Sequence, residues 1–111
     1  MVEITTHIDT SVFTIHVSGE VDASSSIHLD NALENAFESN RKILVDLENL
    51  EYISSAGLGV FISRLEEVKE KEIRLVLYGM NENVKQVFNI LGLENLLIIK
   101  SDRTEAMEAL K

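Results

Sequence analysis

The fold is decided by residues 43–59, which have the sequence ILVDLENLEYISSAGLG. The stretch opens with a nearly continuous apolar run, Ile43–Leu47, which is typical of a central strand covered on both faces. We expect a loop over residues 48–53 and then an amphipathic helix that begins at the serine pair, Ser54 and Ser55. The stretch therefore predicts a buried strand and a following helix with a serine hydroxyl at its N-terminus.

A hydroxyl at this position lies where added negative charge is tolerated. The first N–H groups of a helix are unpaired and its dipole is positive at that end, so a phosphate group there is stabilised. Serine is also a preferred N-cap, which stabilises a helix by about 0.5–2 kcal/mol. The serine pair alone therefore leaves two interpretations open, a phosphorylation site and a purely structural cap.

Strand and helix patterns alternate through the rest of the chain. Val2–Ile8 and Val12–Ser18 are expected to pair antiparallel near a sheet edge. Further strands are expected over 73–78 and 96–99, and helices over 27–39, from the serine pair to Val68, over 81–91 and over 103–110. The order β-β-α-β-α-β-α-β-α favours parallel pairing of strands that helices connect. The sequence predicts one α/β domain over residues 1–111, with a mostly parallel, mixed sheet of about five strands flanked by about four helices.

Helical spacing predicts the buried face of two helices. The helix after the serine pair is expected to bury Leu58, Phe61, Ile62, Leu65 and Val68, and helix 81–91 to bury Val84, Val87, Phe88 and Leu91. The charged run 66–71 is expected to face solvent.

Composition is that of a soluble globular protein, with 45% apolar and 26% charged residues. The chain has no cysteine, as is common in a reducing cytoplasm. A formal charge of −9 disfavours nucleic acids and anionic membranes and favours a partner with a basic face. The sequence has no apolar run of about 18 residues and no signal-peptide pattern at its start. We expect a cytoplasmic protein.

The sequence motifs that would indicate catalysis are weak in this chain. Neither serine of the pair has a glycine two residues before it, as a nucleophile elbow requires. The three histidines, His7, His16 and His28, lack the spacing of a zinc site and are expected at the surface. The glycines of the 57–59 segment form no nucleotide-binding fingerprint. We expect no enzymatic activity, no cofactor and no metal centre.

Two aspartates follow predicted strands. Asp22 ends the segment 19–22, and Asp46 begins the segment 46–55 that leads to the serine pair. Functional loops gather at the carboxyl ends of parallel strands, so we expect these two segments to be neighbours. The aspartates could hold a magnesium ion together, or each could bond nearby backbone as a cap or loop residue.

Three motifs follow one another along the chain: Gly19-Glu20-Val21-Asp22, then Val45-Asp46-Leu47 with Leu50 and Ile53, then Ser54-Ser55-Ala56-Gly57-Leu58-Gly59. Together they resemble the STAS domain, in particular the stand-alone anti-sigma factor antagonists of bacteria. The downstream segments 83–88 and 92–93 fit the same family. The resemblance covers nearly the whole chain, in the expected order and spacing.

The resemblance implies a partner switch. In this family the unphosphorylated domain binds an anti-sigma factor that is also a GHKL-type serine kinase, which frees the sigma factor. The kinase phosphorylates a serine at the start of the second helix and so releases the antagonist, and a PPM-type phosphatase restores it. The motif match assigns the phosphate to Ser55. Ser54 is the less favoured position and stands where family members commonly have aspartate.

The same resemblance implies a partner-binding surface around the phosphorylated serine, formed by Asp22, Ser54, Ala56, Gly57, Leu58, Gly59 and Ser63. A monomer is expected. The alternative function is a STAS scaffold or interaction subunit of another signalling or lipid-transport assembly, in which Ser55 is only a helix cap.

Overall fold

The computed structural model describes residues 1–111 and confirms the predicted order of strands and helices. The elements are β1 (Val2–Asp9), β2 (Val12–Val21), α1 (Ser26–Ser39), β3 (Lys42–Ile53), α2 (Ser55–Ser63), α3 (Leu65–Glu70), β4 (Arg74–Tyr78), α4 (Glu82–Ile90), the 3₁₀ turn η1 (Leu93–Asn95), β5 (Ile98–Lys100) and α5 (Arg103–Ala109). None of the helices is long and apolar enough to cross a membrane.

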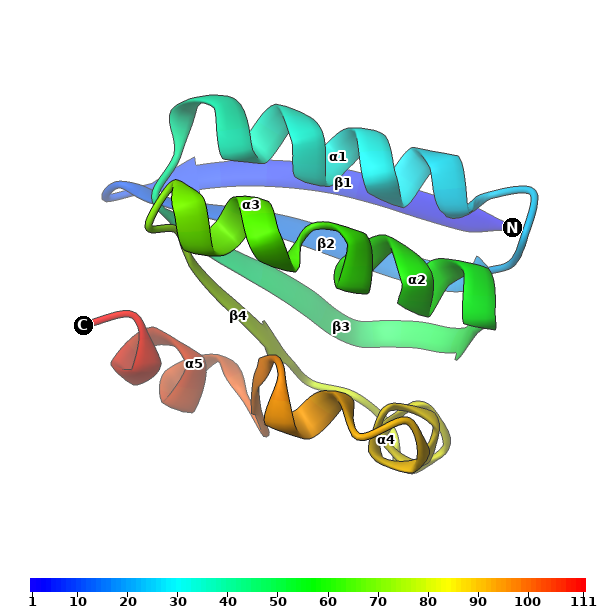
Figure 1. The fold of residues 1–111 in the computed structure, drawn as a ribbon. Helices are drawn as coiled ribbons and strands as arrows, with labels where there is room; N and C mark the ends of the chain where they lie inside the picture. The colour runs from blue at the N-terminus through cyan, green and yellow to red at the C-terminus, as the bar shows by residue number, and fades with distance from the viewer.

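The five strands form one mixed sheet in the order β1-β2-β3-β4-β5. β1 and β2 are antiparallel, as predicted, and the other neighbouring pairs are parallel. Helices α1, α2 and α3 lie on one side of the sheet and α5 on the other (Figure 1). The carboxyl ends of β2 and β3 therefore meet at one end of the sheet, where α1 and α2 begin.

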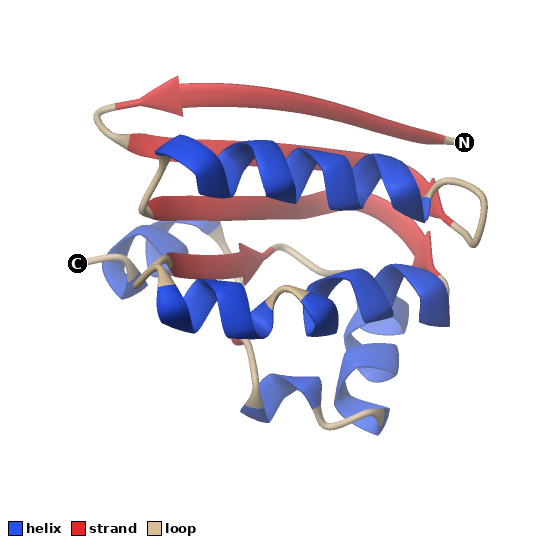
Figure 2. Cartoon of the chain, turned by 45° about the horizontal axis from the view of Figure 1, so that its top comes forward, coloured by secondary structure: helices blue, strands red, loops and turns tan.

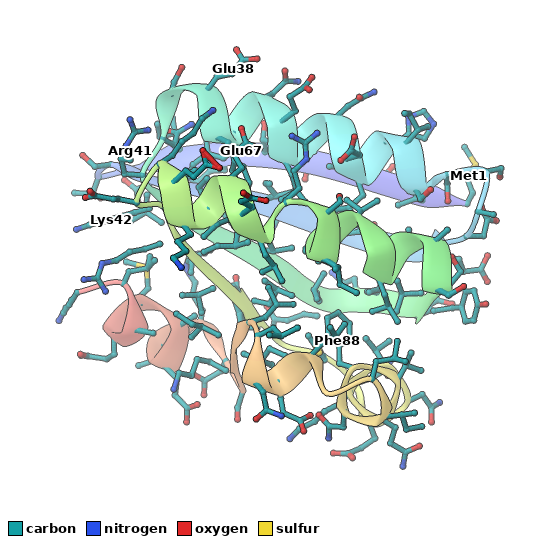
Figure 3. All side chains as sticks on the ribbon, viewed as in Figure 1. Met1, Glu38, Arg41, Lys42, Glu67 and Phe88 are labelled. Carbon is teal, nitrogen blue, oxygen red and sulfur yellow. The ribbon has the colours of Figure 1, made fainter.

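The hydrophobic core is divided between the two faces of the sheet. The larger cluster holds 21 buried residues, mainly from the sheet, α1, α2, α4 and η1, and the smaller one holds six residues from the sheet and the α5 segment. Most of the hydrophobic stabilisation therefore comes from the face that carries α1 and α2. Phe88 projects from α4 toward α2 and β3 (Figure 3), and its ring centroid lies 6.1 Å from that of Phe61.

β2 and β3 are longer than predicted. The expected loop over residues 48–53 is wrong, since these residues extend β3 and pair with β2, with Tyr52 opposite Glu20 and Ile53 opposite Val21. β2 correspondingly continues past Ser18 to Val21. The register shifts twice, and each shift places an extra residue on β3. One consequence is that Asp46 lies inside a strand rather than in a loop.

The helix predicted to reach Val68 is interrupted at Arg64, which ends α2 and begins α3. The buried residues of α2 are Gly57, Leu58 and Phe61, and α3 has none. Ile62, predicted to be buried, is 44% exposed, and Leu65 and Val68 are only partly buried. Leu91 was also predicted to be buried and is exposed, because α4 ends at Ile90.

Candidate functional site

The two serines at the start of α2 have different roles. Ser54 is the N-cap: its backbone is extended (φ −85°, ψ 171°), and its Oγ accepts a hydrogen bond from the Gly57 N–H at 3.3 Å. Ser55 is the first residue of the helix and is exposed. Its hydroxyl makes no hydrogen bond to another part of the chain. The structural cap and the free hydroxyl therefore belong to separate residues, which sequence reasoning could not distinguish.

The start of α2 is packed directly on the ends of β2 and β3. The Ser54 N–H donates to the Val21 carbonyl at 2.8 Å. A Cβ on Gly57 would lie 2.7 Å from Ile53 Cγ1 and 2.8 Å from Val21 Cγ1, so no side chain fits there. Leu58 is buried in the main core. Gly57 and Leu58, both predicted to bind a partner, therefore support the surface from beneath.

Asp22 organises the turn between β2 and α1. Its Oδ1 accepts hydrogen bonds from the hydroxyl and N–H of Ser24 (2.8 and 3.0 Å) and from the hydroxyl and N–H of Ser25 (both 3.0 Å). These bonds, led by that from the Ser24 hydroxyl, hold the pKa of Asp22 below its ordinary value. Since Val21 and Ile53 are paired, Asp22 and Ser54 follow the ends of neighbouring strands, as the loop-end argument predicted.

Asp46 does not join this site. It lies seven residues before Ile53 in β3, roughly 20 Å away at about 3.3 Å per residue. Its Oδ2 is 2.7 Å from His16 Nδ1, and its Oδ1 accepts the Glu48 N–H at 2.9 Å. The magnesium hypothesis for Asp22 and Asp46 is therefore wrong, and no cluster of three metal-binding side chains exists in the chain.

A shallow groove of about 320 Å³ runs between α1 and α2 beside Ser55. It is lined by Ser26, Ile27 and Asp30 from α1 and by Ala56, Gly59, Val60 and Ser63 from α2. The α2 residues have small side chains, which keeps the groove open. A Cβ on Gly59 would meet nothing within 4 Å, so this glycine opens the surface and is not required by packing.

Two exposed isoleucines border this part of the surface. Ile27, in the first turn of α1, is 55% exposed, and Ile62 lies on α2 seven residues after Ser55, on the same helical face. Neither residue was assigned to the site from the sequence. Ile62 has the spacing of a core residue, but the buried side of α2 is formed by Gly57, Leu58 and Phe61.

The charge around the groove is acidic. Arg64 is the cation at its far end, where its Nε lies 2.9 Å from Asp30 Oδ1 and its Nη1 3.0 Å from Glu67 Oε1. A third carboxylate, that of Glu34, lies 3.6 Å from Nη2. These groups, led by the Asp30 hydrogen bond, raise the pKa of Arg64 further and offset its charge. Glu67 lies on the side of α3 that faces α1 (Figure 3).

The STAS domain family model matches residues 3–106 of the chain. The chain belongs to the STAS domain family. The anti-sigma-B factor antagonist of Listeria monocytogenes is 33% identical to this STAS domain over 95 residues, which cover 84% of the chain and 82% of that protein.

Two solved structures share the fold of this STAS domain. An anti-sigma factor antagonist from Mycobacterium paratuberculosis matches with a TM-score of 0.90 and 18% identity, over 99% of this chain and 94% of the other. The Bacillus cell fate determinant SpoIIAA, solved in its phosphorylated form, matches with a TM-score of 0.73 and 20% identity, over 98% and 100% of the two chains.

The STAS domain brings most of the predicted site residues to one region. Ser54, Ser55 and Ala56 form the start of α2, Gly59 and Ser63 follow along the groove, and Asp22 lies at the end of the neighbouring strand. The Ser63 hydroxyl is turned back onto its own helix, where it donates to the Val60 carbonyl at 2.8 Å.

Proposed function

We propose that this STAS domain is an anti-sigma factor antagonist that works by partner switching, with Ser55 as the phosphorylated residue. The observation that carries the proposal is the free, exposed hydroxyl of Ser55 beside the α1–α2 groove, at a helix N-terminus already capped by Ser54. Further support comes from the similarity to the Listeria anti-sigma-B factor antagonist. The domain acts in the cytoplasm and has a regulatory role, without catalysis of its own.

The unphosphorylated domain binds an anti-sigma factor that is also a GHKL-type serine kinase. The groove admits small apolar groups of the partner, and Ile27 and Ile62 supply apolar area on its borders. The acidic surface favours a basic face on the kinase and steers its approach. Binding removes the kinase from its sigma factor, which is then free for transcription.

Phosphorylation ends this complex. Ser55 Oγ attacks the γ-phosphorus of ATP, the bond to the β,γ-bridging oxygen breaks, ADP leaves, and the hydroxyl proton passes to a base of the kinase. The phosphate adds about −1.5 to −2 charges. In the free domain the N-terminus of α2 offsets part of this charge, whereas in the complex the phosphate brings bulk and a desolvation cost. A loss of about 2.7 kcal/mol weakens binding about a hundredfold.

Ser55 is a better acceptor than Ser54 for an energetic reason. The Ser54 hydroxyl oxygen is bonded to the Gly57 N–H, so its phosphorylation would disturb a cap worth about 0.5–2 kcal/mol. Ser55 can be modified with no loss of a bond. A PPM-type phosphatase that removes the phosphate would restore the binding surface unchanged.

The test is phosphorylation by a co-encoded GHKL-type kinase with ATP, read by intact mass and peptide mapping. Wild type and Ser54→Ala should take up one phosphate, and Ser55→Ala should take up none while it still binds the kinase. Absence of both phosphate and kinase binding in the wild type would overturn the proposal and favour a scaffold role in another assembly.

A further inference from the structure

The outer edge of β1 is free. β1 is the first strand of the sheet order, and no helix or strand lies beyond it (Figure 2). Native edge strands are usually protected by proline, charged side chains, a bulge or short length. β1 has eight residues without proline or lysine, and its register with β2 runs from Val2 to Asp9 without a shift. Its two acidic residues, Glu3 and Asp9, are therefore the one protection on this edge against pairing with another strand.

The hairpin fixes which backbone groups face outward. Its two turn residues, Thr10 and Ser11, both have positive φ (49° and 70°), as in a type I′ turn. Such a turn makes Asp9 and Val12 a hydrogen-bonded pair, and alternation leaves the N–H and C=O groups of residues 2, 4, 6 and 8 on the outer edge. The Ser18 hydroxyl donates to the Glu3 carbonyl at 3.4 Å, which agrees with odd-numbered residues facing β2.

We propose that two copies of this chain pair antiparallel through their β1 edges, around a two-fold axis at Thr5. The pairing joins two five-stranded sheets into one of ten strands. It satisfies the outward N–H and C=O groups of β1 with those of the second copy. Strand pairing of this kind draws its affinity from main-chain hydrogen bonds and its specificity from the side chains that alternate along the edge.

The side chains select this register. With Thr5 on the axis, Glu3 lies opposite His7 of the second copy on the face of the sheet that carries α5, and this contact occurs twice by symmetry. On the opposite face, Ile8 lies opposite Val2 of the second copy. Ile8 is 60% exposed in the single chain, and Val2 packs against the main core. The pairing therefore extends the core over an exposed isoleucine.

The two neighbouring registers are less favourable. An axis at Thr6 would place Glu3 opposite Asp9 of the second copy, again twice, and an axis at Ile4 would leave Ile8 with no residue opposite it. Like charges directly opposite each other destabilise a strand pair, whereas Glu3 opposite the neutral ring of His7 brings no such repulsion. The β1 edge is separate from the α1–α2 groove, so each copy keeps its groove open. The inference therefore goes beyond the proposed function and revises the expectation of a monomer.

The test is sedimentation equilibrium of the chain alone, with concentrations up to about 1 mM to detect weak pairing. The wild type should show a monomer–dimer equilibrium. Thr6→Pro removes an outward N–H without touching the β2 ladder, and His7→Glu places two carboxylates opposite each other. Each change should weaken the dimer by about tenfold or more. The double variant Glu3→Lys/His7→Glu replaces the two facing carboxylates with a pair of opposite charges and should restore dimerisation at least to the wild-type level.

Two results would overturn the inference. One is a wild type that remains monomeric at the highest concentration. The other is a dimer whose dissociation constant is unchanged in both Thr6→Pro and His7→Glu. Glu3 and His7 are exposed, so His7→Glu and the double variant keep the fold even if Thr6→Pro perturbs the strand. The experiment contains no kinase, so its outcome is independent of the role of Ser55.

Discussion

Arg64 Nε lies 2.9 Å from Asp30 Oδ1, so the interruption between α2 and α3 is tied directly to α1. The arginine side chain is largely buried, and Asp30 is also a lining residue of the groove. This ion pair therefore fixes the distance between the two helices that form the groove.

Replacing Arg64 with methionine should destabilise the domain and loosen the groove. The change removes two charge-assisted hydrogen bonds, to Asp30 and Glu67, and we expect a loss of about 1.5–3 kcal/mol in the free energy of unfolding. The control is Lys71→Met, which removes a more exposed pair with Glu67 and should cost less than about 1 kcal/mol. Urea unfolding measures both, and equal losses would contradict the role given to Arg64.

Replacing Ser54 and replacing Ser55 should have different effects on the free energy of unfolding. Ser54→Ala removes the cap of α2 and should lower the free energy of unfolding by about 0.5–2 kcal/mol. Ser55→Ala removes an exposed hydroxyl that has no partner and should change it by less than about 0.5 kcal/mol. Thermal or urea unfolding of the two variants side by side checks the assignment, which fails if Ser55→Ala is the more damaging change.

The two glycines of α2 should respond to alanine with opposite signs. Gly57→Ala forces a methyl group against Ile53 and Val21 and should cost about 1–3 kcal/mol of stability. Gly59→Ala adds a methyl group in open space, and the better helix propensity of alanine should stabilise the fold by about 0.5–1 kcal/mol. In the proposed switch, Gly59→Ala also partly fills the groove and should weaken kinase binding despite its greater stability.

Asp22 should contribute to the acid sensitivity of the domain. Its folded pKa is lowered from 3.8, so the ionised form is favoured by folding. The resulting stability is fully present above pH 3.8 and is lost as the pH falls through the lower, folded pKa. In Asp22→Asn this loss of stability at low pH should be absent. A carboxyl titration followed by NMR should place the Asp22 midpoint below 3.8, and a midpoint at or above that value would contradict the hydrogen-bond network.

The element order was predictable because each helix and strand carries its own periodicity. The proximity of Asp22 to Ser54 was predictable for a different reason, since parallel strands end at one edge of the sheet. The length of β3 could not be predicted from the sequence. Its buried residues Leu47, Leu50 and Ile53 are spaced by three because two extra residues sit on this strand opposite β2. A spacing of three hides the period of two by which a strand is recognised.

The surface of α2 was predictable only in part. The glycine and serine positions identified the start of the helix. Which serine caps the helix and which has a free hydroxyl depends on one hydrogen bond, from the Gly57 N–H to Ser54. Ile62 has the spacing of a core residue but is 44% exposed. The interruption of the predicted helix lies at Arg64, whose main partner, Asp30, is 34 residues away in the sequence, and local patterns do not report such long-range ion pairs.

Ile62 should therefore matter for binding more than for folding. It lies on the same face of α2 as Ser55, with Gly59 between them, so in the proposed switch a kinase that reaches the Ser55 hydroxyl should cover this side chain. Ile62→Asp should weaken binding of the kinase by about tenfold or more, because it places a charge in an apolar contact. The matched control is Ile90→Asp on α4, where the isoleucine is 81% exposed and lies away from the groove. Calorimetry with the kinase should show a near-normal affinity for Ile90→Asp, and equal affinities for the two variants would place the binding surface elsewhere.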